Sequence, residues 1–353
     1  MFIKIRYSIK DMILWTRGEL FLFLLLALVP TCLYTFAGLR WLHLPWLPIA
    51  LIGTAVAFII GFQNNVSYDR IWEARKIWGG IVNTSRSLGM MSIAYITNEH
   101  ARIKPTDEQL RDYRKAVIYR HIAWLTSLRY AMREKRPWEG FLSHKTNREW
   151  ANKIQIPEFI YSLDEELRSL LSESDYKYVV SKSNKSTALL SLQSNFLSEL
   201  KGKGIIWEFS YLELEGLLKE LFDLQGKSER IKNFPYPRQY ATLNNFFIWI
   251  FLILLPFGVI PEFAKIGSLF MESYPFIGNW FAWGAIPFIV IVSWVFHTMQ
   301  RIGTVGENPF EGSANDVPIS SISRKIEIDL REMLDEEAEN IPDPFPTIYN
   351  VEM

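Results

Sequence analysis

Four stretches of this chain are long and apolar enough to cross a lipid bilayer as helices, and no other feature constrains the fold as strongly. A helix rises 1.5 Å per residue, so about 20 apolar residues span the hydrocarbon core. The stretches are approximately Leu20–Leu39, Trp46–Gln63, Tyr240–Ile260 and Phe276–Met299. Short loops at Arg40–Pro45 and Pro261–Pro275 join them into two hairpins. We therefore expect an all-α membrane protein with four transmembrane helices per chain.

Lys and Arg residues are concentrated in the segments that would lie on one side of the membrane. Basic residues precede the first and third stretches and follow the second and fourth, whereas Arg40 and Lys265 are the only Lys or Arg residues in the two short loops. Short cytoplasmic segments carry an excess of Lys and Arg. The bias predicts a multi-pass protein of the cell membrane whose termini and long middle segment are cytoplasmic.

The long middle segment has the pattern of a helical layer. Thr106 and Gln109 form a capping box at the start of one helix, and a second helix is expected to run from Pro157 through Leu171. His121 lies on the apolar face of the first of these helices, which is more typical of a core histidine than of a metal ligand. The expected parts of the chain are residues 1–63 with two transmembrane helices, 64–238 as the cytoplasmic helical region, 239–300 with two further transmembrane helices, and 301–353 as a cytoplasmic turn, helix and acidic tail.

Composition and motifs exclude several functions. The chain has 38 Lys and Arg against 38 Asp and Glu, so no strong attraction to nucleic acid is implied. The single cysteine, Cys32, excludes an intramolecular disulfide and a thiolate metal cluster. Gly226, Lys227 and Ser228 resemble the end of a phosphate-binding loop, but the required upstream glycine is Leu221. With no catalytic constellation visible, we expect no enzymatic activity.

The second apolar stretch carries an aromatic stripe. Thr54, Phe58 and Phe62 are spaced four residues apart, which places them on one face of a helix. A helix that only had to sit in lipid would need no such stripe. Polar residues begin at Asn64, and neither proline nor glycine interrupts the chain before Trp78. This predicts one long helix that leaves the bilayer and continues into water.

The run from Gly61 to Val82, GFQNNVSYDRIWEARKIWGGIV, resembles the bestrophin family, and in particular its prokaryotic branch. Matching features extend to about Leu334. The family consists of pentameric ion channels whose second transmembrane helix lines a narrow hydrophobic neck. The resemblance implies a homopentameric ring in which Thr54, Phe58 and Phe62 form the neck, with threonine where the family usually has an aliphatic residue.

A second constriction is implied at the cytoplasmic exit of the pore. The step Glu229–Ile231 and the proline pair at Pro235 and Pro237 are similar to family features that precede the third transmembrane helix. Matching upstream from them places Leu212 at the position of the family's cytoplasmic aperture.

A calcium site is a weaker implication of the same resemblance. Animal bestrophins bind calcium in an acidic run after an Asn-Pro-Phe turn, here Asn308–Phe310. Calcium prefers six to eight oxygen ligands, and the run from Glu311 to Asp316 contains only two carboxylates. Asn308 and Asp316 are the candidate ligands, but we expect a capped turn without calcium, and no other cofactor.

The function implied is a passive ion channel for chloride or other small anions, with a hydrophobic neck that gates by dewetting. Two alternatives stay open: a channel of the same architecture for monovalent cations, and a membrane-anchored scaffold or signalling protein without conduction. A secondary transporter would show repeated, broken helices and intramembrane ionisable residues, and neither is visible. The expected partners are small inorganic ions, the lipid bilayer and further copies of the chain.

Overall fold

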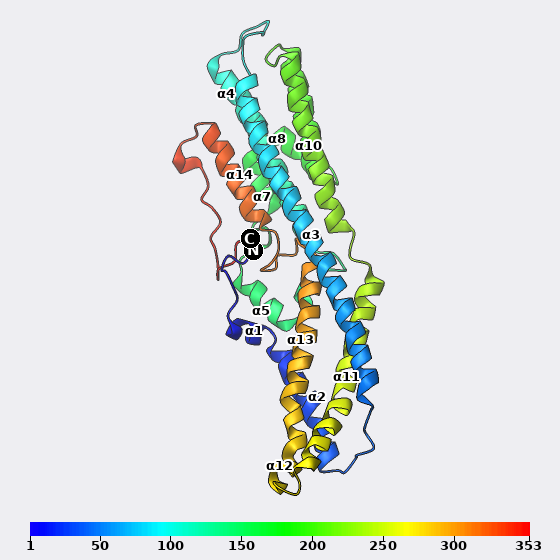
Figure 1. The fold of residues 1–353 in the computed structure, drawn as a ribbon. Helices are drawn as coiled ribbons and strands as arrows, with labels where there is room; N and C mark the ends of the chain where they lie inside the picture. The colour runs from blue at the N-terminus through cyan, green and yellow to red at the C-terminus, as the bar shows by residue number, and fades with distance from the viewer. The chain divides into compact units, whose positions relative to one another are not determined.

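The computed structural model describes residues 1–353 and consists of α-helices, short 3-10 turns and connecting loops (Figure 1). The α-helices are α1 (Ile9–Trp15), α2 (Arg17–Thr35), α3 (Trp46–Tyr95), α4 (Asp107–Arg133), α5 (Lys145–Lys153), α6 (Pro157–Ile160), α7 (Leu163–Leu170), α8 (Glu173–Val180), α9 (Lys185–Gly202), α10 (Glu208–Asn233), α11 (Arg238–Leu269), α12 (Pro275–Trp280), α13 (Ala285–Gly306) and α14 (Ile319–Met333). The 3-10 turns are η1 (Phe141–Ser143), η2 (Phe281–Gly284) and η3 (Ala338–Asn340). The expected all-α class is confirmed.

Four helical segments have the length and hydropathy of membrane spans, as expected. They are α2, the first part of α3, α11, and the run Pro275–Gly306 that contains α12, η2 and α13. The expected loop at Pro261–Pro275 was wrong in where it begins, because α11 continues through Pro256 and Pro261 to Leu269. Membrane helices tolerate internal proline where neighbouring helices re-satisfy the freed backbone groups. The loop before α12 is therefore only residues 270–274.

The expected long helix through the membrane boundary is also confirmed. Helix α3 has 50 residues from Trp46 to Tyr95 without interruption. Its apolar and charged halves contribute to two different compact units. We call residues 4–69 and 235–307 the span unit, and residues 1–3, 70–234 and 308–353 the layer unit.

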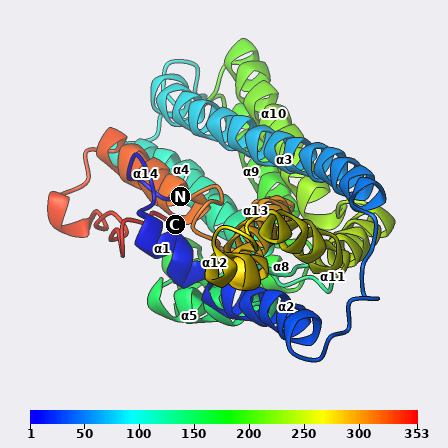
Figure 2. The same cartoon turned by 60° about the horizontal axis from the view of Figure 1, so that its bottom comes forward.

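The span unit is a bundle in which α2 packs on α13, and α11 packs on both (Figure 2). Its core includes Phe23 of α2, Val56 of α3 and Phe251 of α11. Helices α3 and α11 approach closely at Gly53, where a Cβ atom would lie 2.7 Å from Cε2 of Phe251. A small residue at such a crossing lets the side chain of one membrane helix pack against the backbone of the other.

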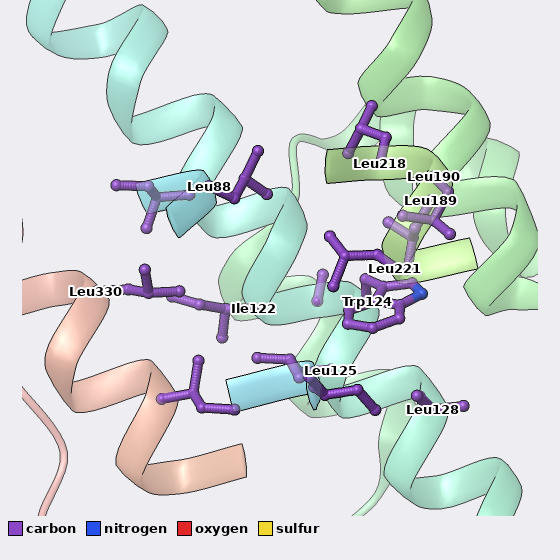
Figure 3. Close-up of a cluster of buried hydrophobic side chains, with 14 of the residues drawn as sticks. Leu88, Ile122, Trp124, Leu125, Leu128, Leu189, Leu190, Leu218, Leu221 and Leu330 are labelled. Atoms are coloured by element: carbon purple, nitrogen blue, oxygen red, sulfur yellow. The ribbon is translucent and has the colours of Figure 1, made fainter. Parts of the chain in front are cut away.

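The layer unit is built around α4, which contacts α7, α9, α10 and α14. Figure 3 shows side chains of α4, such as Ile122 and Trp124, between Leu330 of α14 and Leu221 of α10. The capping box at Thr106 and Gln109 is present. The apolar face expected on α4 at His121 is buried, together with Leu110, Val117, Trp124 and Leu128.

His121 is a core histidine, as expected. It is buried, stacks on Trp124 with ring centroids 5.2 Å apart, and has Nε2 at 2.8 Å from the Ser85 hydroxyl. Burial lowers the pKa of His121 to about 3, so the ring is neutral at ordinary pH.

The expected single helix from Pro157 through Leu171 was wrong. The structure has two short helices, α6 and α7, separated by Tyr161 and Ser162 in extended conformation. The Tyr130 hydroxyl of α4 lies 2.7 Å from Oε1 of Glu166 and 3.0 Å from the carbonyl of Tyr161, so tertiary contact with α4 accompanies the break.

The two ends of the described chain pair within the layer unit (Figure 1). Phe2 and Val351 form an isolated antiparallel bridge. The amide of Ile3 donates to the carbonyl of Asn350 at 3.0 Å, and the amide of Glu352 donates to that of Met1 at 2.9 Å. The acidic tail therefore returns as a strap to the N-terminal residues.

Candidate pore-lining face

One face of the first part of α3 is open. Thr54, Phe58 and Phe62 are exposed in the protomer, and the two phenylalanines have 67% and 66% of their surface accessible. Their ring centroids lie 6.4 Å apart, so they form a continuous aromatic strip along the helix. Gly61 beside them also faces open space, with no atom within 4 Å of an added Cβ.

The opposite face of the same helix is closed. Gly53, Val56, Ile60 and Gln63 are buried and recur every three or four residues, on the side of the helix opposite the open residues. Val56 and Ile60 belong to the apolar core of the span unit. Packing thus fixes the rotation of α3 about its own axis and presents the aromatic strip outward from the protomer.

Thr54 is less polar at this face than its residue type suggests. Its hydroxyl donates a hydrogen bond to the carbonyl of Ala50 at 2.9 Å, one turn earlier in α3. This bond to the helix backbone satisfies the hydroxyl proton. The open face at Thr54 therefore presents a methyl group and hydroxyl lone pairs without a free donor.

A buried polar network holds α3 beside Phe62, and sequence reasoning missed it. Gln63 donates from Nε2 to Oε1 of Glu307 at 2.9 Å and accepts at Oε1 from Asn244 at 3.2 Å. Glu307 also lies 3.6 Å from Arg238. A satisfied buried network specifies one arrangement of its helices. The sequence signalled only the polar boundary at Gln63, because its partners are 181 and 244 residues away.

Charged residues that follow the span bind α3 to the end of α10 within the layer unit. Arg70 donates to the carbonyls of Ile231 and Phe234 at 2.9 and 3.0 Å. Glu73 forms an ion pair with Arg230. These contacts anchor the helix just beyond the residues that lie in the span unit.

Leu212 also lies on an open face. It is 58% exposed on α10, whereas Leu214, Leu218 and Leu221 of the same helix are buried. The side chain is thus available at a surface of the layer unit, and its role as an aperture stays a prediction.

The two calcium candidates have protein partners. Asp316 accepts at Oδ2 from the amides of Gly312 and Ser313 at 2.7 and 3.0 Å, and lies 3.9 Å from the Arg133 guanidinium. Asn308 donates to Glu311 at 2.6 Å. No group of three or more His, Cys, Asp or Glu side chains has a geometry that could hold a metal ion.

Burial governs the protonation of this turn. It raises the pKa of Asp316, although Arg133 and the turn amides oppose the rise. Burial and the Asp316 charge together raise the pKa of Glu311 to about 7. The turn therefore holds less negative charge near neutrality than its two carboxyl groups suggest.

Comparison with known proteins places this architecture in a family. The chain matches the family model described as bacterial and fungal bestrophin protein over residues 1–332. The voltage-dependent anion channel-forming protein YneE of Escherichia coli K12 is 25% identical over 303 residues, covering 86% of this chain and 80% of that protein. A protein of Ralstonia nicotianae with the same descriptive name is 25% identical over 303 residues, covering 83% and 82%.

A solved structure shares the fold. The bacterial bestrophin homologue of Klebsiella pneumoniae superposes with a TM-score of 0.68 at 22% identity, covering 91% of this chain and 99% of the other. Since the family model matches nearly the whole sequence, the chain belongs to the bacterial and fungal bestrophin family, whose members are ion channels and not enzymes.

Proposed function

We propose that this protein is a passive anion channel of the membrane and that the open face of α3 lines its pore. One observation carries the proposal: Phe58 and Phe62 are two-thirds exposed on a helix whose opposite face is locked into the span unit. Relatives described as voltage-dependent anion channel-forming proteins support the choice of ion sign.

The pore requires several copies of the chain. One open helical face cannot enclose a water path, whereas a closed ring brings the same face of each copy to a shared axis. We place five copies in the ring, on the resemblance to pentameric bestrophins. Thr54, Phe58 and Phe62 then form three stacked rings of the neck, and Leu212 forms the cytoplasmic aperture.

The neck would gate by dewetting. Rings of phenylalanine offer no hydrogen bonds to water, so a narrow neck empties and raises the barrier to any ion. Slight widening rehydrates it. Because the positive edges of aromatic rings can face a passing anion, chloride and other small anions are the conducted ions in this scheme. The alternative is a neck that is selective for monovalent cations. The reversal potential of the current distinguishes the two.

We place both termini and the layer unit in the cytoplasm. The positive-charge bias of the segments outside the spans supports this orientation. The pairing of Phe2 with Val351 requires only that the two ends lie on the same side, as an even number of spans provides.

We further propose that conduction does not depend on calcium. The bonds from Gly312 and Ser313 to Asp316, with Arg133 beside them, support this view because they supply positive charge and donors where a cation would bind. Channel open probability should be the same with calcium and with a calcium chelator on the cytoplasmic side. Activation by calcium would contradict this part of the proposal.

The pore assignment is tested by widening the neck. In the Phe58→Ala, Phe62→Ala double variant, loss of both rings should raise chloride flux from liposomes several-fold. Phe21→Ala is a matched control, because Phe21 of α2 is similarly exposed at 64% but lies outside the proposed neck. Unchanged flux in the double variant would contradict the assignment.

Ion selectivity is tested by single-channel recording in asymmetric chloride. An anion channel gives a reversal potential near the chloride equilibrium potential, and a cation channel gives one of opposite sign. A bilayer that stays silent in every salt would favour the scaffold alternative.

A further inference from the structure

The short helix before the first span is a separate element of the span unit. Helix α1 begins after Ser8, which forms a capping box with Asp11. The Asp11 amide donates to the Ser8 hydroxyl at 3.1 Å, and the Ser8 amide donates to the Asp11 carboxylate at 3.2 Å. Thr16, with φ −108° and ψ 16°, separates α1 from α2. Both helices belong to the span unit, and Figures 1 and 2 show that α1 does not continue along α2.

The junction between α1 and α2 lies at the edge of the apolar part of the span unit. Trp294 of α13 donates from Nε1 to the Thr16 hydroxyl at 2.9 Å. Arg301, the first charged residue after the apolar stretch of α13, donates to the carbonyl of Trp15 at 3.0 Å. Tryptophan is enriched where a span meets water. Because α1 has only 7 residues, all of it lies within about 10 Å of this boundary.

The outward side chains of α1 are apolar and uncovered. Ile9 and Ile13 are about one turn apart on the same face of the helix, and 78% and 45% of their surfaces are exposed. Ile5, in the segment before the helix, is fully exposed. No residue of α1 is buried in the protein. Amphipathic helices at a bilayer bury such a face between the headgroups and the acyl chains.

Cations accompany this apolar face. Lys4 and Arg6 precede the helix, Lys10 lies in its first turn, and all three are exposed. The two carboxylates of the same stretch are engaged within the protein, one in the capping box and the other, Glu19, with Arg301 at 2.8 Å. Basic segments beside a span are attracted to anionic lipid headgroups. A long side chain such as that of Lys10 can keep its ammonium at the headgroups while its stem lies along apolar surface.

The exposed surface of α1 is continuous with that of the first span. Helix α2 follows directly and has large apolar side chains exposed along its length, including Phe21, Leu25 and Val29. A span with such a surface is suited to lipid. This continuity favours the bilayer as the cover for α1, rather than a second copy of the chain.

We propose that α1 and the segment before it form an anchor on an anionic phospholipid surface. Ile9 and Ile13 lie among the upper acyl chains, and Lys4, Arg6 and Lys10 lie at the headgroup phosphates. The anchor has no part in the proposed pore. Its test needs no ion conduction, so its failure and the failure of the channel proposal are distinguishable.

Contact with lipid is tested by fluorescence quenching on the full chain. In a Cys32→Ser background, Ile9→Cys carries a bimane label in phosphatidylcholine vesicles with equal fractions of either brominated phosphatidylglycerol or brominated phosphatidylcholine. Both brominated lipids should quench the label. The anionic lipid should associate about fivefold more tightly, as expected for one basic residue at an anionic surface. A label at Ile13→Cys, on the same face, should give the same ranking.

Three results would overturn the proposal. Quenching by aqueous iodide alone would place the labelled face in water. A label that neither iodide nor brominated lipid quenches would place this face against protein, such as a second copy of the chain. Equal quenching by the two brominated lipids would remove the anionic preference.

Charge variants locate the anionic lipid. In the triple variant Lys4→Gln, Arg6→Gln, Lys10→Gln, the preference for phosphatidylglycerol should disappear while both lipids still quench the label. The matched control removes the same charge by replacing three exposed lysines of the layer unit with glutamine. These are Lys104, Lys182 and Lys219. All the substituted side chains are exposed, so both proteins should fold. An unchanged preference in the first variant, or an equal loss in the control, would contradict the assignment of these cations.

Discussion

The span unit leaves a larger share of its large apolar side chains exposed than the layer unit does. In the layer unit, Trp78 and Trp124 are fully buried, and even Arg129 and Glu158 lie in the interior as an ion pair. In the span unit, Phe58 and Phe62 remain two-thirds exposed. The layer unit thus has the larger closed core, although some of its apolar side chains, such as Leu212, stay exposed. The span unit leaves part of its apolar surface for lipid, for other copies or for a pore.

The contrast also holds within α3, which contributes to both units. Its open strip at Phe58 and Phe62 lies opposite the packed face at Gly53 and Val56. Since packing already fixes the packed face, the strip can change without loss of the protomer fold. In the proposed pore, function would therefore be tuned on one face of the helix while stability depends on the other.

The largest expected effect is on the buried charges of the layer unit. Glu158 accepts from Ser320 at 2.8 Å and pairs with both Arg129 and Arg133. Glu158→Ala would leave two buried guanidinium groups without this partner and should lower the free energy of unfolding by about 3–5 kcal/mol. Chemical unfolding of the purified protein measures the change.

The exposed Glu173 is the matched control for that variant. It pairs with Lys177 at 3.2 Å in solvent, so Glu173→Ala should cost at most about 1 kcal/mol. Similar losses in the two variants would remove the distinction between the packed interior and the surface of the layer unit.

A pair of glycines tests the two faces of α3. Gly53→Leu would push a side chain into Phe251 and should destabilise the span unit by about 2–3 kcal/mol. Gly61→Leu enters open space and should not destabilise the span unit, since replacing a helical glycine favours the helix by up to about 1 kcal/mol. Unfolding in mixed detergent micelles compares the two. Equal tolerance at both positions would mean that the rotation of α3 described above is wrong.

A smaller effect is expected from the core histidine as pH falls. Burial lowers the pKa of His121 to about 3, below the value of about 6.5 for an unfolded chain. Below about pH 6.5 the unfolded state therefore binds a proton at His121 that the folded state does not bind. The free energy of unfolding falls by about 1.4 kcal/mol for each unit by which the pH is lowered.

The pH effect is measured against His121→Gln, which cannot titrate. Between about pH 7 and about pH 5, wild type should lose about 2 kcal/mol more than this variant. Parallel losses in the two proteins would show that the ring is accessible to protons in the folded state.

Much of this architecture could be predicted from local patterns. The spans, the long helix through Gln63 and the capping box at Thr106 each depend on residues close together in the chain. The helix expected through Pro157 is interrupted at Tyr161, whose carbonyl contacts Tyr130, a residue 31 positions away that local patterns do not reveal.

The candidate site shows the same limit. The helical spacing of Thr54, Phe58 and Phe62 predicts that they share a face, but not that this face is open. The structure identifies the open face, because Val56 and Ile60 on the opposite face pack in the core of the span unit. The network at Gln63 was not predicted, because its partners come from distant segments.

Accessibility of the α3 strip to an aqueous reagent during conduction tests the central claim most directly. With Cys32, the only cysteine, replaced by serine, Phe58→Cys and Phe21→Cys would be exposed to a charged, membrane-impermeant thiol reagent while current is recorded. If the strip lines the pore, Phe58→Cys current changes on modification and recovers with a reductant, and Phe21→Cys current stays constant. An unmodified Phe58→Cys channel that conducts throughout would contradict the claim, because its residue 58 would then face lipid or protein.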